Sequence, residues 1–133
     1  MTKLFLTYLA VAVALFALDM VWLRLIAVDW YQQGLAHLLA PQPKLAAAAA
    51  FYLLYPVGLM VFAVHPSLQQ EGLMRAAVLG GMFGFFAYAT YDLTNLAVLR
   101  DWPIGLSMID VAWGAVVSAI GAVAGKFAYG LLH

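Results

Sequence analysis

Three aspartates lie inside stretches that are otherwise apolar: Asp19 in LFALDMVWLRLI, Asp92 in YATYDLTNLAVL and Asp110 in SMIDVAWGAVV. Placing a charged side chain at the centre of a bilayer costs roughly 2.5–3.5 kcal/mol on insertion scales, so intramembrane acids usually serve a function. Carboxyl groups in such surroundings can transfer protons or accept hydrogen bonds from a ligand. We therefore interpret the three aspartates as candidate catalytic residues.

Aromatic and amide side chains accompany these acids at helical spacing. Asp-x-x-Trp occurs twice, and residues three apart share one face of a helix. The segment 91–95, YDLTN, places four hydrogen-bonding side chains within little more than one turn. These neighbours would form the walls of a site and orient a ligand. The predicted ligand-binding residues are Trp22, Tyr55, Tyr88, Tyr91, Asn95 and Trp113.

The composition is that of an integral membrane protein. The chain has 133 residues, of which 67% are hydrophobic and 9% charged, whereas soluble domains have about 25% charged residues. Its length predicts a single domain over residues 1–133. A net charge of zero gives no indication of nucleic-acid binding, and the absence of cysteine excludes disulfides and Cys-ligated clusters.

Four apolar segments are long enough to cross about 30 Å of hydrocarbon as helices. They are Leu4–Ala27, Leu45–Val64, Leu73–Val98 and Ile104–Leu132. Polar segments rich in Pro, Gln and Gly separate them, and no alternating strand pattern is present. The predicted fold is therefore an all-α bundle of four transmembrane helices.

The first connection contains the string DWYQQGLAHLLA, residues 29–40. Asp29 suits a helix start, and Trp30 and Tyr31 are residue types that favour the membrane–water boundary. We expect a short interfacial helix here, which would lie over one end of the bundle. A plain irregular loop is the alternative.

The alternating direction of four spans places the three acids at one depth. Asp19 lies eight residues before the end of its span, Asp92 lies six before the end of its span, and Asp110 lies six after the start of its span. Those three ends face the same side of the membrane. The acids would lie roughly 9–12 Å below that side, in a single layer.

Small residues share the helix faces that carry two of the acids. Gly80-x-x-x-Gly84 lies on the stripe of Asp92, and Gly114-x-x-x-Ser118 lies on the stripe of Asp110. Small residues at this spacing let helix backbones approach closely in lipid. The pattern predicts that the third and fourth spans pack against each other through the faces that hold the acids.

Each acid also has a purely structural explanation. Ser107-x-x-Asp110 resembles a capping box, in which case Asp110 would only begin a helix. Asp19 could pair with Arg24 or accept a bond from a tryptophan of a neighbouring helix. Asp92 could belong to a fully satisfied internal network.

Other chemistries find little support in the sequence. His37, His65 and His133 are scattered, and no dense histidine cluster, P-loop or nucleophile-elbow motif occurs. A site for a hard cation made by the three carboxylates alone is a minor alternative. We predict no metal site and leave the cofactor unknown.

Several strings together resemble a family of small bacterial predicted membrane proteins of unknown function. They are Asp19-x-x-Trp22-Leu23, YDLTNLA at 91–97, Trp102-Pro103 and Asp110-x-Ala112-Trp113-Gly114. The resemblance covers essentially the whole chain. It implies a four-helix, multi-pass protein of the bacterial inner membrane, names no activity, and favours lipid-related functions.

Three hypotheses of function remain open. The first is an intramembrane pocket that binds, or also converts, a lipid-like or isoprenoid-like amphiphile. The second is a proton-coupled small transporter that works as a homo-oligomer. The third is an accessory protein whose polar cluster only fixes helix packing. The sequence does not decide whether the chain is an enzyme. Four spans place both termini on the same side of the membrane. Lys and Arg are divided three and three between the two sides, so they do not decide the orientation, and cytoplasmic termini are only a weak preference.

Overall fold

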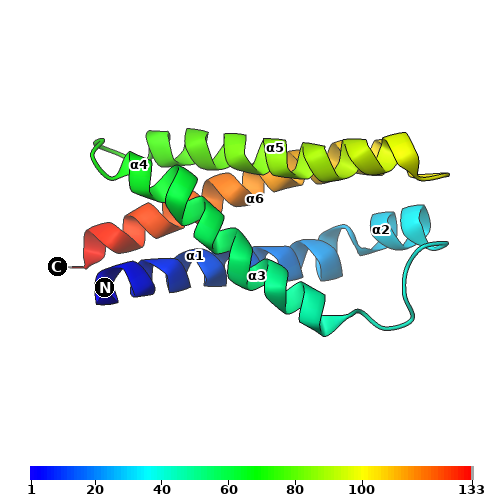
Figure 1. Cartoon of the computed structure of the whole chain (residues 1–133), viewed down its shortest axis with the longest axis horizontal. Helices are drawn as coiled ribbons and strands as arrows, with labels where there is room; N and C mark the ends of the chain where they lie inside the picture. Colours follow the sequence, from blue (N-terminus) through cyan, green and yellow to red (C-terminus); the bar gives the residue numbers. More distant parts are fainter. Residues whose placement is uncertain (133) are drawn as a thin grey trace.

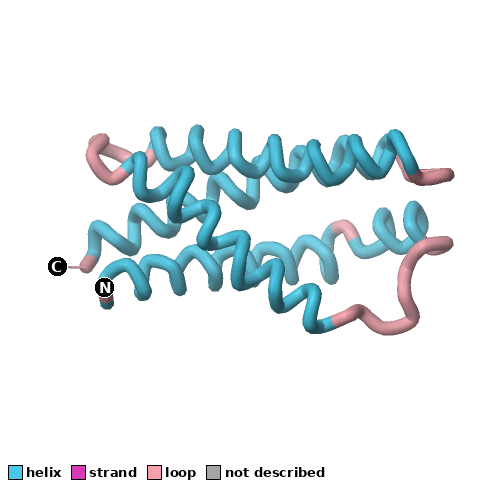
Figure 2. The backbone as a smooth tube through the Cα atoms, in the orientation of Figure 1, coloured by secondary structure: helices cyan, strands magenta, loops and turns pink. Residues whose placement is uncertain are grey.

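The computed structural model describes residues 1–132, and these form helices and connecting loops without any strand. Figures 1 and 2 show that the helices are long and the loops short, apart from the one that follows α2. The helices are α1 (Thr2–Val21), the π-helical turn η1 (Trp22–Ile26), α2 (Val28–Leu35), α3 (Leu45–Leu59), the π-helical turn η2 (Met60–Val64), α4 (His65–Ser67), α5 (Met74–Val98) and α6 (Ile104–Leu131).

The π-helical turns continue the helices before them, so α1 with η1 and α3 with η2 and α4 form two long rods. The rods α5 and α6 lie side by side, α1 packs along α6, and α3 crosses α1 obliquely (Figure 1). Both termini lie at the same end of the molecule. The pairing of α5 with α6 and the common end for the termini agree with the sequence prediction.

Three of the helical rods are long and apolar enough to cross a membrane within the described part of the chain. They are Thr2–Ile26, Leu45–Ser67 and Ile104–Leu131. The fourth expected span, α5, has 25 residues but falls outside this group. Its second half carries Tyr88, Asp92 and Asn95 among other polar residues, which lower its mean hydropathy.

The outward faces of all four rods are apolar. Exposed side chains include Phe5 on α1, Leu54 on α3, Phe86 on α5 and Phe127 on α6. Soluble proteins rarely expose continuous apolar surface of this kind. The exposed faces therefore fit contact with lipid.

Glycines bring α5 and α6 together, as predicted. A Cβ added at Gly80 would lie 2.6 Å from the carbonyl oxygen of Ser118, and one at Gly84 would collide with the carbonyl of Gly114. Because no side chain separates the two backbones, the faces that carry Asp92 and Asp110 are held close together.

A second glycine contact joins α6 to α1. Gly121 lies against Leu15, and Gly125 lies against Val11, where an added Cβ would meet a methyl group at 2.5 Å. Val11 and Leu15 belong to a buried core that also includes Leu59 of the α3 rod. This core fills the half of the molecule nearer the termini.

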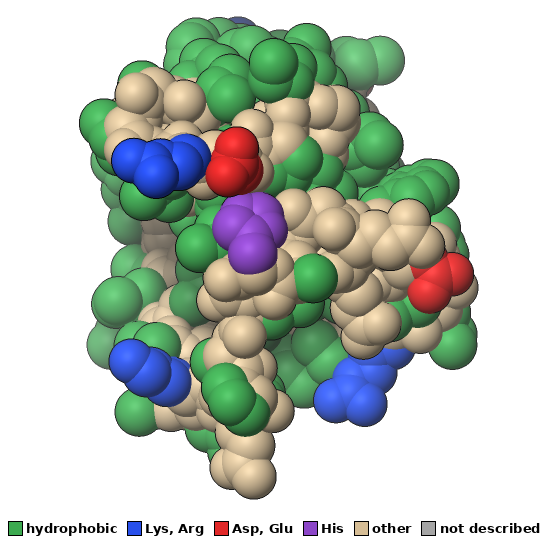
Figure 3. Space-filling view, turned by 90° about the vertical axis from the view of Figure 1, so that its right-hand side faces the viewer, with side chains coloured by type: hydrophobic (Ala, Val, Ile, Leu, Met, Phe, Trp, Pro, Cys, Tyr) green, Lys and Arg blue, Asp and Glu red, His purple; other side chains and the backbone are tan. Residues whose placement is uncertain are grey.

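The loops are fixed by local contacts. Asp101 has a positive φ of 61°, Trp102 donates a hydrogen bond from Nε1 to Ser107 Oγ (2.8 Å), and Pro103 precedes the first residue of α6. At the opposite end, Lys126 Nζ donates to the carbonyl of Gln70 (2.7 Å). The end that carries the α2–α3 and α5–α6 connections displays several charged side chains of both signs and a histidine (Figure 3).

The predicted helix of the first connection is present but shorter than expected. It spans Val28–Leu35 as α2, and a turn replaces the helix after Leu35. Pro41 and Pro43 follow in an irregular segment before α3 begins. The short helix packs against η1 and α6, so it covers one end of the helical assembly.

The α5–α6 contact yields a first prediction. Gly84→Ala forces a methyl group into the backbone of α6 and should lower the free energy of unfolding by about 1–3 kcal/mol, as overpacking usually does. Gly81→Ala is the matched control, because its Cβ would lie 3.7 Å from the nearest atoms of α6. Thermal unfolding in detergent should separate the two variants; equal melting temperatures would contradict the proposed close contact.

Candidate functional site

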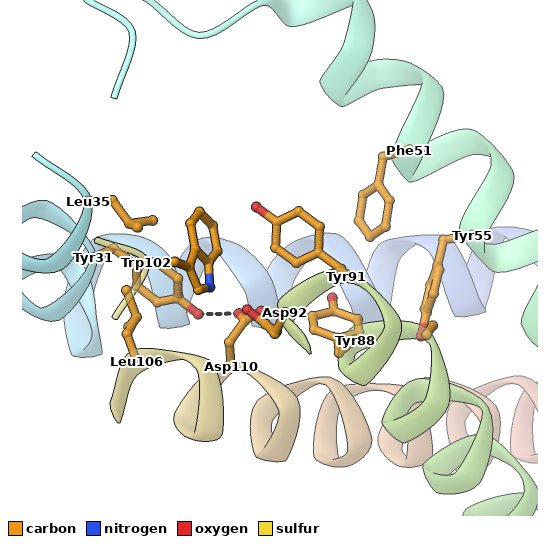
Figure 4. Close-up of a pocket in the computed structure, with 11 residues that line it drawn as sticks. Tyr31, Leu35, Phe51, Tyr55, Tyr88, Tyr91, Asp92, Trp102, Leu106 and Asp110 are labelled. Atoms are coloured by element: carbon orange, nitrogen blue, oxygen red, sulfur yellow. Dashed lines mark hydrogen bonds between the residues drawn. The ribbon is translucent and has the colours of Figure 1, made fainter. Parts of the chain in front are cut away.

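A cavity of about 450 Å³ lies among α2, α3, α5 and the first turns of α6 (Figure 4). Two carboxyl groups, six aromatic rings and three aliphatic side chains line it. They are Tyr31, Leu35, Phe51, Tyr55, Ala87, Tyr88, Tyr91, Asp92, Trp102, Leu106 and Asp110. This combination of an apolar wall with a few convergent polar groups is typical of small-molecule sites.

Asp92 and Asp110 form the polar part of the cavity. Their carboxyl groups lie next to each other, one from α5 and one from α6 (Figure 4). Asp92 is only 2% exposed, and its Oδ2 has no hydrogen-bond partner within the described part of the chain. A buried carboxyl oxygen is costly unless it receives a hydrogen bond, either from a proton held between Asp92 and the adjacent Asp110 or from a bound ligand.

The seam between α5 and α6 sets the position of this pair. Gly80, Gly84, Tyr88 and Asp92 recur every four residues on α5 and therefore share one face. The ring of Tyr88 occupies the space that a side chain at Gly114 would need. The same packing that joins the helices thus directs Tyr88 and Asp92 toward α6.

The short helix α2 closes one side of the cavity through Tyr31. The Tyr31 hydroxyl donates a hydrogen bond to Asp110 Oδ1, drawn as the dashed line in Figure 4. It also accepts one from Trp22 Nε1 (3.3 Å). Burial, and then the bond to Asp110, raise the pKa of Tyr31, so this hydroxyl stays protonated and keeps donating at neutral pH.

Packing also holds α2 in place. Gly34 packs closely against the side chains of Leu106 and Pro103, where an added Cβ would lie 3.0 and 3.3 Å from their carbons. Ala27, which connects η1 to α2, is fully buried. The helix is thus fixed by contacts at both ends and contributes Tyr31 and Leu35 to the cavity wall.

Asp19 belongs to a separate, satisfied network beside the cavity. Its Oδ2 accepts a hydrogen bond from the Tyr52 hydroxyl, and its Oδ1 accepts one from Trp113 Nε1, both at 2.8 Å. The Trp113 ring is stacked on that of Trp22, with centroids 4.5 Å apart and planes within 4°. This carboxyl group therefore ties α1, α3 and α6 together.

The aromatic walls contact one another. Tyr91 and Trp102 meet edge to face at 5.8 Å, and Tyr55 and Tyr88 do so at 6.1 Å. The Tyr55 hydroxyl is already engaged with Ser118 Oγ at 2.7 Å. Tyr55 therefore contributes mainly its ring to the cavity.

The structure brings some of the predicted site residues together and places others outside the cavity. Asp92, Asp110, Tyr55, Tyr88 and Tyr91 line the cavity. Asp19, Trp22, Trp113 and Asn95 do not, although the first three form the network beside it. The three acids occupy neighbouring positions without sharing a single hollow.

Other lining residues were not identified from the sequence as site residues. They are Tyr31, Leu35, Phe51, Ala87, Trp102 and Leu106. Tyr31 lies in the segment expected to cover the bundle end, and Trp102 begins the Trp-Pro pair that supports the family resemblance. Both could therefore have been considered as site residues from the sequence. The aliphatic residues Leu35, Ala87 and Leu106 could not be identified in this way, because nothing in the sequence distinguishes them from lipid-facing residues.

The structural alternatives have different outcomes. Asp110 does not cap α6, because that helix begins at Ile104 and Ser107 Oγ instead donates to the Pro103 carbonyl (2.9 Å). The tryptophan partner suggested for Asp19 is present as Trp113. For metals, no group of three or more His, Cys, Asp or Glu side chains is placed to hold an ion in residues 1–132.

The Asp19 network yields a second prediction. Asp19→Ala leaves the Tyr52 hydroxyl and the Trp113 indole without their acceptor and should lower the free energy of unfolding by about 1–3 kcal/mol. Asp29→Ala removes an exposed acid from the first turn of α2 and should cost less than about 1 kcal/mol. Thermal unfolding in detergent compares them, and equal losses would mean that Asp19 does not tie the helices together.

Comparison with known proteins gives one positive result. Neither the curated proteins nor the solved structures contain a match to the chain. The model of the family described as "Predicted membrane protein (DUF2177)" matches residues 4–127. This match confirms the family resemblance inferred from the YDLTNLA and DxAWG strings. The chain therefore belongs to this family of predicted membrane proteins, whose function is unknown.

Proposed function

We propose that this membrane protein binds a small amphiphile in the aromatic cavity, with the polar head of the ligand at Asp92 and its apolar tail directed toward the bilayer. The observation that carries the proposal is the buried Oδ2 of Asp92, which lacks a partner although its residue lines the cavity. A ligand that donates a hydrogen bond would satisfy this oxygen and remove the cost of burying it.

The exposure of the lining residues supports this orientation. Asp92 is 2% exposed, whereas Phe51 is 39% and Tyr91 55% exposed. The cavity therefore runs from a polar floor to an aromatic mouth between α3 and α5, which diverge at this end of the molecule (Figure 1). The apolar outer faces of the same helices suit a tail that leaves through this mouth into lipid.

We propose further that α5 is a fourth membrane span and that the four rods form a transmembrane bundle. With 25 residues, α5 is about 37 Å long, enough to cross the hydrocarbon core. Asp92, one of its most polar residues, faces inward, and its outer face carries exposed Phe85, Phe86 and Leu93. A polar residue inside the bundle lowers hydropathy without contacting lipid.

The absence of cysteine makes this topology testable by single-cysteine labelling. Cysteines placed at the exposed positions Gln42 and Arg100 should react with a membrane-impermeant maleimide from one side, and one at Gln69 from the opposite side. Labelling of Gln69→Cys and Arg100→Cys from the same side of intact cells or oriented vesicles would exclude α5 as a span.

The packing of the other half of the molecule favours binding over transport. Val11, Leu15, Leu59, Val64 and Val117 fill the interior between the cavity and the end that carries the termini. A transport pathway would need this core to open. A ligand that enters and leaves through the lateral mouth needs no such rearrangement.

Replacing the unpartnered acid separates a binding role from a packing role. Asp92→Leu removes a buried polar group that has no partner, so the variant should fold with equal or higher stability. It should lose binding of 1-dodecanol and dodecylamine, measured by native mass spectrometry of the detergent-solubilised protein. The loss should be at least about tenfold in Kd, the value of one hydrogen bond to a charged group.

Thr90→Leu is the matched control, because Thr90 is exposed on the same helix and does not line the cavity. This variant should keep both binding and stability. Wild-type protein that binds neither amphiphile, or Asp92→Leu protein that binds both as the wild type does, would overturn the proposed function.

A further inference from the structure

We propose that the head group recognised by the cavity is an organic cation, specifically a protonated alkylamine that retains at least one N–H. The inference rests on the proposed function and names the chemical class of its ligand. Three properties of the cavity carry it: the sign of its charged groups, the number of its aromatic rings and the unpartnered acceptor at its floor.

The charged groups of the cavity wall are all acidic. Asp92 and Asp110 line it, and no Lys, Arg or His is among its lining residues. Two neighbouring carboxyl groups in apolar surroundings repel each other when both are ionised, and a bound cation offsets that repulsion. A fatty-acid carboxylate or a phosphate would add to the repulsion, so anionic amphiphiles are disfavoured.

The aromatic rings suit the same ligand. Six of the lining residues are aromatic, contributed by α2, α3, α5 and the α5–α6 loop. Ring faces attract cations within about 6 Å, and substituted ammonium groups are recognised by such aromatic cages. Tyr31 and Tyr55 already direct their hydroxyls to protein partners. A ligand would therefore contact the rings of Tyr31 and Tyr55 rather than their hydroxyl groups.

The acceptor at the floor distinguishes an ammonium group from a metal ion. An N–H of the ligand would donate to Asp92 Oδ2, which is the acceptor left without a partner. A hard metal cation would need about six oxygen ligands, and the walls offer two carboxyl groups surrounded by rings and aliphatic side chains. The cavity volume of about 450 Å³ accommodates an ammonium head with the first part of an alkyl chain.

The test compares three probes of equal chain length near neutral pH, namely dodecylamine, 1-dodecanol and dodecanoate. Native mass spectrometry of the full chain in an uncharged detergent gives their relative affinities. Dodecylamine should bind at least about tenfold more tightly than 1-dodecanol, as expected when a charged group joins the hydrogen bond, and dodecanoate should bind most weakly.

Two variants separate charge from hydrogen bonding and from ring contact. Asp92→Asn keeps an acceptor but removes the charge, so it should weaken dodecylamine binding at least about tenfold and 1-dodecanol binding less, which brings the two affinities close together. Tyr91→Leu should weaken dodecylamine binding about three- to tenfold, the range of a cation–π contact. Phe86→Leu, at an exposed residue of the same helix outside the cavity, should not.

The outcomes distinguish this inference from the proposed function. Equal affinity for 1-dodecanol and dodecylamine, with Asp92→Leu still abolishing both, would overturn the cation and keep the amphiphile site. Tightest binding of dodecanoate would also overturn the cation. Failure of all three probes to bind the wild-type protein would overturn both proposals together.

Discussion

One close contact, between α5 and α6, positions the two acids of the cavity, including the buried Asp92. Asp92 reaches this position because α5 and α6 approach each other through Gly80, Gly84 and Gly114, which leave no side chains between the backbones. The same contact sets Asp110 beside it (Figure 4). Close helix packing in lipid depends on small residues, so the stripe that joins the helices is also the stripe that builds the polar floor of the cavity.

The two acidic networks differ in what they do for the protein. Both oxygens of Asp19 receive hydrogen bonds from other helices, so this carboxyl group works as a structural connection. Asp110 is partly satisfied through Tyr31, which links the cavity to the covering helix α2. Asp92 Oδ2 receives no hydrogen bond from a Tyr, Trp or backbone donor of the described chain, and its neighbour is the Asp110 carboxyl group. The number of hydrogen bonds received thus falls from Asp19 to Asp110 to Asp92, and Asp92 is the acid that we propose bonds to a ligand.

Much of the fold follows from sequence patterns, because apolar length and glycine spacing act locally. The helical segments, the α5–α6 seam and a short helix after the first rod were all predicted. The second half of α5 is too polar for this helix to qualify as a span by hydropathy, so its crossing of the membrane is a proposal. The cavity was only partly predictable. Periodicity places Tyr88 and Asp92 on one face, but whether Asp19 shares their hollow depends on Tyr52 of α3 and Trp113 of α6 reaching it from their own helices. The contribution of Phe51 depends on how α3 diverges from α5, which no local pattern encodes.

The proposed binding mode requires that a ligand reach the buried Asp92 Oδ2 at the floor of the aromatic cavity. An experimental structure of the protein in lipid, obtained in the presence of dodecylamine, tests this most directly. We expect density for the amine nitrogen within hydrogen-bond distance of Asp92, with the alkyl chain leaving past Phe51 and Tyr91. A closed cavity, with Asp92 bonded to a protein group and the amphiphile bound elsewhere, would contradict it.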